Sequence, residues 1–478
     1  MLFNSLTFFV FAAAFFPVYF ALKGRARLWW ILLASYLFYG WWDWRFLGLL
    51  GFSTMVDYWI GRWLADETDQ HKRTRLLIFS LVVNLGLLGT FKYFNFFADS
   101  LAHLAQSLGV TLSWPTLHII LPVGISFYIF QTLSYTIDVY RGRCAPERSL
   151  LRFACYVALF PQLVAGPIVR ASDLLPQLQV DWPFDWHRMR RGLELVTWGF
   201  FLKLVVADTI GQVLVQDRSF EEPARYGAVG HLVHTILFSF QIYGDFAGYS
   251  LIAIGLGWIM GFDFGVNFRR PYLAASFSEF WQRWHISLSS WLRDYLYIPL
   301  GGNRHGVLNT SRNLFVTMFL GGLWHGAAWT FVVWGLLHGF YLAVWHIGEA
   351  QMKRFSLLTS ATARIWLRPL MVICVFMLTS LAWVFFRSPS LANAWEIVKR
   401  ICLLAGSIEP LTMDKIGLAK CVLVVAIVLA VDLVAEMRPA PIARANAEYV
   451  HAGRIVVLLW MIAFLGTFSG AEFIYFQF

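Results

Sequence analysis

The sequence has few charged residues. Only 14% of its 478 residues are charged, whereas 59% are hydrophobic and 18% are aromatic. Soluble domains carry about a quarter charged residues, so this chain has too few to cover a surface that faces water. Apolar segments of about 20 residues, long enough to cross a bilayer, recur along the whole chain. The short alternating segments of a transmembrane barrel are absent. We therefore expect an all-α, polytopic integral membrane protein with roughly ten to thirteen tilted helices.

Several classes of site are also missing. The five cysteines form no CxxC pair and have no metal-ligand spacing, so we expect neither a disulfide framework nor a metal site. There is no GxSxG elbow, Walker A, HExxH or dinucleotide-binding motif, and a covalent serine mechanism has no local support. The net charge is +10, but lysine and arginine gather in short loops rather than in a long basic tail. This pattern is typical of membrane orientation signals, and we expect no binding of nucleic acid.

The basic loops predict the orientation of the chain. The first cluster, Lys23–Arg27, follows the first apolar segment, and the aromatic, basic stretch Arg269–Arg312 comes later; we place both at the cytoplasmic side. Two apolar segments do not fit a simple crossing. Phe153–Val169 is broken by proline and indicates a re-entrant segment, and Asn313–Leu323 is too short to cross alone. We find no internal repeat or soluble linker, so residues 1–478 are predicted to form one membrane domain. Further spans are expected at His231–Phe262, Ala327–Ile347, Pro369–Phe386, Ala419–Val434 and Ile455–Phe468.

Ionisable residues occur within or at the edge of the apolar segments. They are Asp57, Lys92, Asp138, Lys203, Asp208 and Asp245. Such residues are functional candidates by default, but for each one alone we favour a structural ion pair or an interfacial anchor. Asp245 is the strongest functional candidate, because Gln241 lies four residues before it and would share its helix face.

Of the 12 histidines, His325 is the main catalytic candidate. It lies between glycines in Gly321–Gly326, where the surroundings are otherwise apolar and an imidazole needs a partner to replace water. A neutral imidazole can take the proton from a hydroxyl while that oxygen attacks an acyl carbonyl. The glycines allow an extended acyl thioester to approach and offer N–H groups to a developing oxyanion. His285 is the second candidate. For His338 we favour helix-packing hydrogen bonds, although it could line a cavity.

Six stretches spread over nearly the whole length carry a family resemblance. They are Leu121–Tyr128, Phe160–Pro167, Tyr243–Ser250, Glu279–Arg304, Gly321–Gly326 and the closing Phe473–Phe478. With these stretches the chain resembles the membrane-bound O-acyltransferase superfamily, and within it the group of alginate O-acetyltransferase membrane subunits. One departure is that Leu251 follows Ser250, where many relatives carry an acidic residue.

The resemblance implies a ring of tilted helices with a central tunnel that the donor enters from one side and the acceptor from the other. The invariant family histidine falls on His325 and the second family histidine on His285, which are the predicted catalytic residues. Donor-binding residues are predicted to be Arg283, Trp284, Arg293, Asn303, Arg304 and Trp324. Tunnel-lining residues are predicted to be Gln241, Asp245, Gly321, Gly322, Gly326 and His338. The basic stretch Arg269–Arg312, which contains five of these six donor-binding residues and not Trp324, would suit the phosphates of a nucleotide-bearing donor.

By the same analogy, the reaction moves an acetyl group from a cytoplasmic donor, acetyl-CoA, across the inner membrane. The recipient would be a periplasmic SGNH-type acetyltransferase partner, which modifies a polysaccharide such as alginate, cellulose or peptidoglycan. No bound cofactor is expected. The alternatives are a transporter or flippase subunit of an exopolysaccharide export system, a scaffold subunit of such a system, and an enzyme that acylates a lipid. A transporter would use intramembrane charges and inverted repeats, and the chain has no visible repeat.

Overall fold

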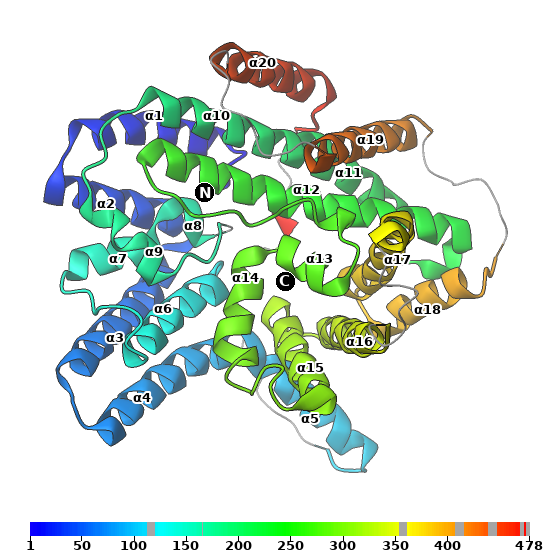
Figure 1. The fold of residues 1–478 in the computed structure, drawn as a ribbon, viewed down its shortest axis with the longest axis horizontal. Coiled ribbons are helices and arrows are strands. Elements are labelled where there is room, and N and C mark those ends of the chain that lie inside the picture. Colours follow the sequence, from blue (N-terminus) through cyan, green and yellow to red (C-terminus); the bar gives the residue numbers. More distant parts are fainter. Residues whose placement is uncertain are drawn as a thin grey trace. The chain divides into compact units, whose positions relative to one another are not determined.

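The structure is a computed structural model that describes residues 1–111, 120–164, 166–352, 361–406, 415–437, 447–468 and 473–474. Within these ranges every regular element is a helix, and none is a strand (Figure 1). This confirms the all-α prediction. Six helices of the described residues are long and apolar enough to cross a membrane, and two shorter apolar helices accompany them. The six are Gln70–Ser107, Trp186–Asp217, Ala228–Met260, Trp329–Glu349, Trp366–Arg387 and Lys415–Met437.

The chain divides into two compact units. Unit 1 comprises Met1–Val196 and Ser250–Gly265, and unit 2 comprises Thr197–Tyr249 and Val266–Phe478. The single membrane domain predicted for residues 1–478 stays a prediction. Both predicted catalytic histidines belong to unit 2.

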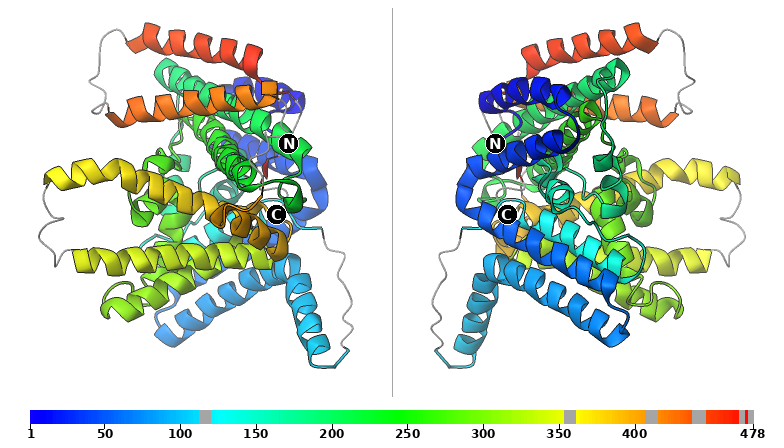
Figure 2. Two further views of the ribbon diagram at one scale, coloured as in Figure 1. Left: turned by 90° about the vertical axis from the view of Figure 1, so that its right-hand side faces the viewer. Right: turned by 90° about the vertical axis from the view of Figure 1, so that its left-hand side faces the viewer.

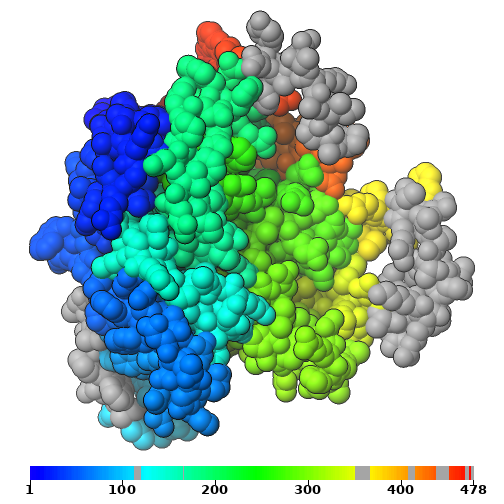
Figure 3. Space-filling model, turned by 60° about the vertical axis from the view of Figure 1, so that its left-hand side comes forward, coloured from blue at the N-terminus to red at the C-terminus, as the bar shows by residue number. Residues whose placement is uncertain are grey.

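Unit 1 holds the N-terminal helices, coloured blue to teal, whose surface is seen in Figure 3. Its elements are α1 (Leu6–Ala21), α2 (Gly24–Asp43), α3 (Leu47–Asp66), α4 (Gln70–Leu88), α5 (Phe94–Ser107), α6 (Ile125–Tyr140), α7 (Leu150–Ala158), α8 (Phe160–Leu163), α9 (Ala171–Leu174) and most of α10 (Trp186–Phe200). The segment predicted as re-entrant is indeed interrupted: α7 ends at Ala158 and the four-residue α8 follows, with Pro161 in its first turn. Proline is tolerated there because the first N–H groups of a helix have no partner within it.

A buried carboxylate links three helices of unit 1. Asp57 on α3 accepts hydrogen bonds from Ser80 Oγ at 2.5 Å and Asn84 Nδ2 at 2.8 Å, both on α4. Thr136 Oγ1 on α6 donates a third at 2.9 Å. The hydroxyl of Ser53 in turn donates to Asn84 Oδ1 at 2.9 Å. Each oxygen of the carboxylate therefore has a donor, which is what a buried charge requires.

Unit 2 contains the remaining helices. They are α11 (Asp208–Asp217), the larger part of α12 (Ala228–Met260), α13 (Phe277–Arg283), α14 (Ile286–Leu292), α15 (Gly306–His325), α16 (Trp329–Met352), α17 (Ala361–Arg387), α18 (Leu391–Cys402), α19 (Lys415–Met437) and α20 (Ala447–Leu465). The spans expected from the sequence after residue 326 correspond to α16, α17, α19 and α20. Asn313–Leu323, predicted to be too short to cross alone, is part of α15, which begins at Gly306, has 20 residues and is not among the six candidate spans. The added first turns include Asn309, Thr310, Ser311 and Arg312, which hydropathy alone does not mark as helical.

Helices α15 and α16 pack side by side, and α17 lies along α16 (Figure 2). Glycines set the close approach of the first pair. A Cβ atom at Gly322 would overlap the Phe331 carbonyl oxygen, and one at Gly335 would overlap the Met318 carbonyl oxygen. Small residues of this kind let helix backbones approach each other in membrane proteins. The contact brings the C-terminal end of α15, where His325 lies, against the first turns of α16.

Helix α12 uses a similar pair of glycines. A Cβ atom at Gly244 would lie 3.0 Å from the Leu202 carbonyl oxygen, and one at Gly248 would lie 2.8 Å from the Gly199 carbonyl oxygen. This approach places Asp245 beside Lys203, which lies in a π-helical segment, Phe201–Ala207. The Lys203 Nζ atom is 2.8 Å from both Asp245 Oδ1 and Asp208 Oδ1. Of the two alternatives favoured for these residues, an ion pair or an interfacial anchor, the structure shows the ion pair.

Candidate active site

His325 is the last residue of α15 and is 4% exposed. Its ring lies among aromatic side chains, with ring centroids 5.0 Å from Trp324, 4.9 Å from Trp334 and 5.4 Å from Phe386. All three contacts are edge-to-face, a favourable geometry for aromatic pairs. Gly326 follows in an extended conformation, and a Cβ atom there would overlap the Phe331 ring. The end of α15 therefore presents an imidazole in an apolar, aromatic environment.

His285 lies between two short helices, α13 and α14, and is completely buried. Its φ angle of 42° is in the left-handed region, which is uncommon for a residue other than glycine. Residues with such strained backbone angles are found often at active sites. Ser276 caps the start of α13 through a 3.0 Å bond from Glu279 N to its Oγ atom. The chain leaves α13 after Arg283 and begins α14 at Ile286, so this reversal positions the histidine.

Asn267 determines the tautomer of His285. The Asn267 Oδ1 atom accepts from the Ser287 backbone N–H at 3.2 Å and from Ser287 Oγ at 2.9 Å, so the atom facing them is the amide oxygen. His285 Nδ1 is 3.2 Å from the same oxygen and must carry the proton to donate to it. The lone pair of the neutral ring is then on Nε2. Burial lowers the pKa of His285, which is outside the six candidate spans, to about 3, so the ring is neutral at pH 7.

Trp324 joins the two histidines. Its ring centroid is 5.0 Å from that of His325 and 6.0 Å from that of His285. The Phe246 ring also contacts His285, with centroids 4.6 Å apart. Phe246 directly follows Asp245 on α12, so the Lys203–Asp245 ion pair adjoins a residue that contacts His285. Two imidazoles that the sequence separates by 40 positions thus share one aromatic cluster.

His338 extends this cluster by one turn of α16. It is fully buried, and its ring centroid lies 4.9 Å from Trp334 and 5.0 Å from Trp281. Among the described residues, neither ring nitrogen of His338 has a hydrogen-bond partner. The indole nitrogens of four nearby tryptophans are likewise buried and have no partner there; they are Trp281, Trp284, Trp334 and Trp383. Buried polar groups are nearly always satisfied, so such a concentration of unsatisfied nitrogens is unusual.

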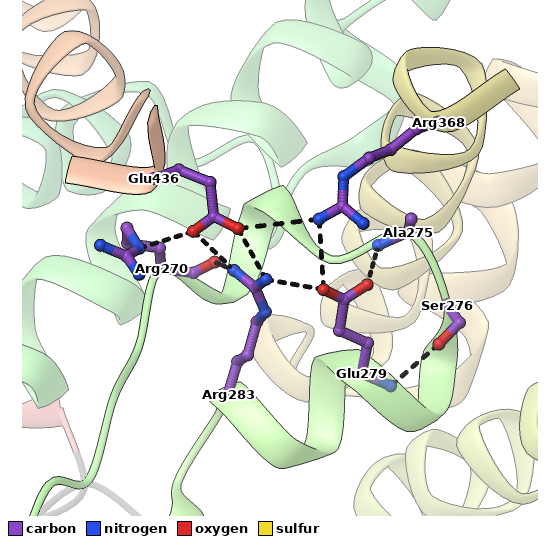
Figure 4. Close-up of polar contacts among 7 residues, drawn as sticks. All are labelled: Arg270, Ala275, Ser276, Glu279, Arg283, Arg368 and Glu436. Carbon is purple, nitrogen blue, oxygen red and sulfur yellow. Dashed lines mark hydrogen bonds and ion pairs between the residues drawn. The ribbon is translucent and has the colours of Figure 1, made fainter. Parts of the chain in front are cut away.

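Arg283, a predicted donor-binding residue, belongs to a network of ion pairs (Figure 4). Its Nη2 atom is 2.6 Å from Glu279 Oε1 on α13 and 2.8 Å from Glu436 Oε1 on α19. Arg270 lies 2.8 Å from Glu436 Oε2, and Arg368 on α17 lies 3.3 Å from Glu279 Oε1. The network therefore ties the helix that precedes His285 to α17 and α19.

The other predicted donor-binding residues fall into two groups. Trp284 and Trp324 are buried in the aromatic cluster, where the Trp284 ring is 5.1 Å from Trp383. Arg293, Asn303 and Arg304 are exposed instead, and Arg293 pairs with the adjacent Asp294 at 2.7 Å. The structure thus brings the two tryptophans to the histidines, whereas these three residues lie at the surface.

The predicted tunnel-lining residues are also separated. Phe331 fills the space beside Gly322 and Gly326, so neither glycine faces an open passage there. A Cβ atom at Gly321 would lie 3.3 Å from Leu292 Cδ1. Asp245 binds Lys203 and accepts from the Ile474 backbone N–H at 2.6 Å. Gln241 lies one turn earlier on α12, and its buried Oε1 atom has no partner among the described residues. The part of the chain that the structure describes contains no group of three or more histidine, cysteine or carboxylate residues placed to hold a metal ion.

Sequence reasoning missed two residues that shape the site. Asn267 lies 18 positions from His285, so no local pattern connects them. Trp334 contacts both His325 and His338. A signal for Trp334 was present, because it lies four residues before His338 and shares its helix face.

Helices long and apolar enough to cross a membrane, with buried histidines among them, are typical of a polytopic membrane protein. The chain belongs to the membrane-bound O-acyltransferase family, whose family model matches residues 145–387. That range contains all three buried histidines of the cluster. The protein is therefore a multi-pass membrane O-acyltransferase.

Its relatives include enzymes with different named acceptors. The chain is 43% identical over 400 residues to a probable alginate O-acetylase of Azotobacter vinelandii, covering 83% of this chain and 77% of the relative. It is 34% identical over 432 residues to the peptidoglycan O-acetyltransferase of Helicobacter pylori, covering 83% and 79%. It is 27% identical over 251 residues to the teichoic acid D-alanyltransferase of Bacillus subtilis, covering 50% and 62%.

Proposed function

We propose that this protein moves acetyl groups from a cytoplasmic donor, acetyl-CoA, across the inner membrane for the O-acetylation of a cell-envelope or secreted polysaccharide. A periplasmic SGNH-type acetyltransferase would receive the acetyl group and modify the polymer. The names of two relatives that each cover 83% of this chain, a probable alginate O-acetylase and a peptidoglycan O-acetyltransferase, support a polysaccharide as the final acceptor.

One observation carries the chemical part of the proposal. His325 and His285 are both buried, and both contact the ring of Trp324. In this position His325 acts as a general base without a serine or cysteine nucleophile. A positioned base of this kind contributes about 10²- to 10⁴-fold to the rate.

The proposed reaction is a direct transfer. The imidazole of His325 takes the proton from the acceptor hydroxyl as its oxygen attacks the thioester carbonyl. The new C–O bond forms, the C–S bond breaks, and the leaving thiolate takes the proton from the imidazolium. His285 is held by Asn267 with its lone pair on Nε2, so it can accept a hydrogen bond from the acceptor hydroxyl and orient it.

The unsatisfied nitrogens around His338 support the prediction that this region holds a polar ligand. Leaving a buried donor unpaired costs about 1–3 kcal/mol, and several such groups lie together here. A thioester donor with amide and carbonyl oxygens would accept hydrogen bonds from the indole N–H groups. The prediction that His338 forms helix-packing hydrogen bonds is wrong for the described residues, because neither nitrogen has a partner among them.

The test follows the label from the donor. The full chain is reconstituted in vesicles with acetyl-CoA labelled in its acetyl group, and the label is traced to protein, polysaccharide and lipid fractions in the presence of the candidate partner. The proposal predicts label on the partner and then as ester-linked acetate on the polymer.

Other outcomes are distinct. Label in the lipid fraction would show a lipid acceptor. Flux of an intact polysaccharide or lipid precursor without acyl transfer would favour the transporter alternative. In cells, ester-linked acetate should fall on one envelope polymer when the protein is removed, and that polymer identifies the acceptor.

A further inference from the structure

Two hollows on unit 1 adjoin each other away from the histidine cluster. One has a volume of about 350 Å³ and is formed by the loop between α6 and α7 together with α9. The other has a volume of about 180 Å³ and is formed by the start of α2 and residues 178–181. Arg152 and Gln179 line both. The segments that form them, residues 19–31 in dark blue and 143–181 in cyan to teal, adjoin on the face of unit 1 in Figure 3.

The lining of this double hollow, called the arginine groove here, is strongly basic. Its two carboxylates are Glu147 and Asp181. Its five arginines come from separate segments of the chain: Arg25, Arg27, Arg143, Arg148 and Arg152. The groove therefore carries an excess of positive charge. Arg25 and Arg27 belong to the basic loop Lys23–Arg27, which the distribution of lysine and arginine predicts to be cytoplasmic, and the groove is placed on that side with them.

Two of the arginines are fixed in place. Arg27 donates from Nε to the Leu22 carbonyl oxygen and from Nη1 to the Trp182 carbonyl oxygen, each at 2.8 Å. Arg152 donates from Nη2 to Glu147 Oε1 at 2.8 Å. The Arg152 Nε atom is buried and has no partner among the described residues, although its side chain lines both hollows. A guanidinium held by one edge offers the other to a ligand, and its planar fork matches phosphate oxygens.

The remaining three arginines are exposed. Among the described residues, Arg25, Arg143 and Arg148 have no carboxylate within ion-pair distance. A neighbouring hollow of unit 1 differs in this respect. It is larger, about 650 Å³, and its charged lining residues are two acids and two bases: Asp66, Glu67, Lys72 and Arg75. Positive charge therefore exceeds negative charge in the arginine groove but not in its neighbour.

We propose that the arginine groove binds the headgroup of an anionic phospholipid of the cytoplasmic leaflet. Basic pockets beside membrane helices on the cytoplasmic side are suited to anionic headgroups, and each basic residue near such a surface contributes about fivefold to binding. Apolar residues at the groove favour a lipid over a soluble phosphate. Val180 lines the smaller hollow and is 46% exposed, and Leu150, between Arg148 and Arg152, is 37% exposed. Both can contact acyl chains.

The experiment compares two charge-matched double variants of the full chain. Arg143→Gln with Arg148→Gln alters the groove, and Lys72→Gln with Arg75→Gln alters the balanced neighbouring hollow. Each protein is delipidated in a neutral detergent and titrated with short-chain phosphatidylglycerol or phosphatidylcholine at about 0.1 M salt, where surface charges are partly screened. Native mass spectrometry counts the bound lipids, and inorganic phosphate is added as a competitor in a separate arm.

The groove variant is expected to bind phosphatidylglycerol about 25-fold more weakly than the unaltered protein, at about fivefold per arginine. The Lys72/Arg75 control should change by less than about twofold, since a balanced site gives no net attraction. Equal loss in both variants, or no preference over phosphatidylcholine, would overturn the proposal. Displacement of the lipid by equimolar inorganic phosphate would overturn it as well and would make the groove a site for soluble phosphates.

Discussion

Two clusters of buried polar side chains, one in unit 1 and one in unit 2, are built differently. In unit 1, both oxygens of Asp57 are occupied by donors from α4 and α6. In unit 2, both nitrogens of His338 and the indole nitrogens around it have no partner among the described residues. In the first cluster, the carboxylate oxygens receive their hydrogen bonds from the protein itself. The second leaves donors to which the proposed ligand would supply hydrogen-bond acceptors.

This difference distinguishes a polar residue that stabilises the fold from one that is proposed to bind a ligand, although the two look alike in the sequence. A polar group within an apolar segment is a functional candidate in either case. What distinguishes Asp57 from His338 is the presence or absence of partners on neighbouring helices. Changes in the first cluster should therefore lower stability, and changes in the second should lower activity.

The largest effect on stability is expected for Asp57→Ala. Ser80, Asn84 and Thr136 would lose their common acceptor, at about 1–3 kcal/mol for each buried donor left unpaired. The midpoint of thermal unfolding in detergent should fall sharply, and acetyl transfer per folded molecule should stay unchanged. Thr136→Val, which removes one donor and leaves the carboxylate in place, is the milder control. An unaltered midpoint for Asp57→Ala would show that the network contributes little.

A second contrast uses two adjacent glycines. Gly322→Ala should destabilise the protein by about 2 kcal/mol, because its Cβ atom would overlap a backbone carbonyl oxygen of α16. Gly321→Ala should have a much smaller effect, since its nearest neighbour is the flexible end of Leu292. Thermal unfolding and acetyl transfer of the two variants provide the comparison. Equal behaviour would contradict the close packing of α15 on α16.

The ion-pair network beside His285 offers a third contrast. Arg283 has a side chain that is 14% exposed and pairs with two carboxylates, whereas Arg368 is 47% exposed. Arg283→Gln should cost about 1.5 kcal/mol of stability, the magnitude of a hydrogen bond to a charged group. Arg368→Gln should cost less than about 0.5 kcal/mol, because exposed pairs contribute little. The contrast fails if Arg368→Gln is the more damaging of the two in thermal unfolding.

The smallest effect on stability is expected for His338→Leu. No hydrogen bond to the described residues is lost, so the free energy of unfolding should change by no more than about 1 kcal/mol through altered aromatic contacts. Acetyl transfer should nevertheless fall about tenfold, the equivalent of one hydrogen bond to the donor. Steady-state rates at several donor concentrations would separate weaker binding from slower chemistry. Full activity in a stable His338→Leu protein would contradict the proposal that this cluster binds a ligand.

Much of the fold could be predicted from the sequence, because hydropathy and helix length are local properties. The segment expected at Ala327–Ile347 is helix α16, and the one expected at His231–Phe262 is helix α12. Hydropathy did not indicate where helices continue beyond their apolar segments, as α15 does by beginning at Gly306. Hydropathy identifies the apolar part of a helix, but the helix itself can extend beyond that part into polar sequence.

Less of the candidate site could be predicted, because its contacts depend on tertiary structure. The flanking glycines and apolar context marked His325, and the structure places it beside Trp324 and Trp334. Nothing in the spacing indicated that Asn267 would orient His285. The basic composition of Arg269–Arg312 predicted a phosphate site, yet Arg283 in that stretch has two carboxylate partners. Charge in a sequence does not reveal which charges neutralise one another.

The most direct test of the central claim is the rate of acetyl transfer by His325→Ala in reconstituted vesicles, measured per folded molecule. His325→Asn serves as a second variant that keeps a polar side chain. If His325 is the general base, both variants should lose about 10³-fold in rate while thermal unfolding shows that they remain folded. A folded His325→Ala protein that transfers acetyl groups within tenfold of the unaltered protein would contradict the account.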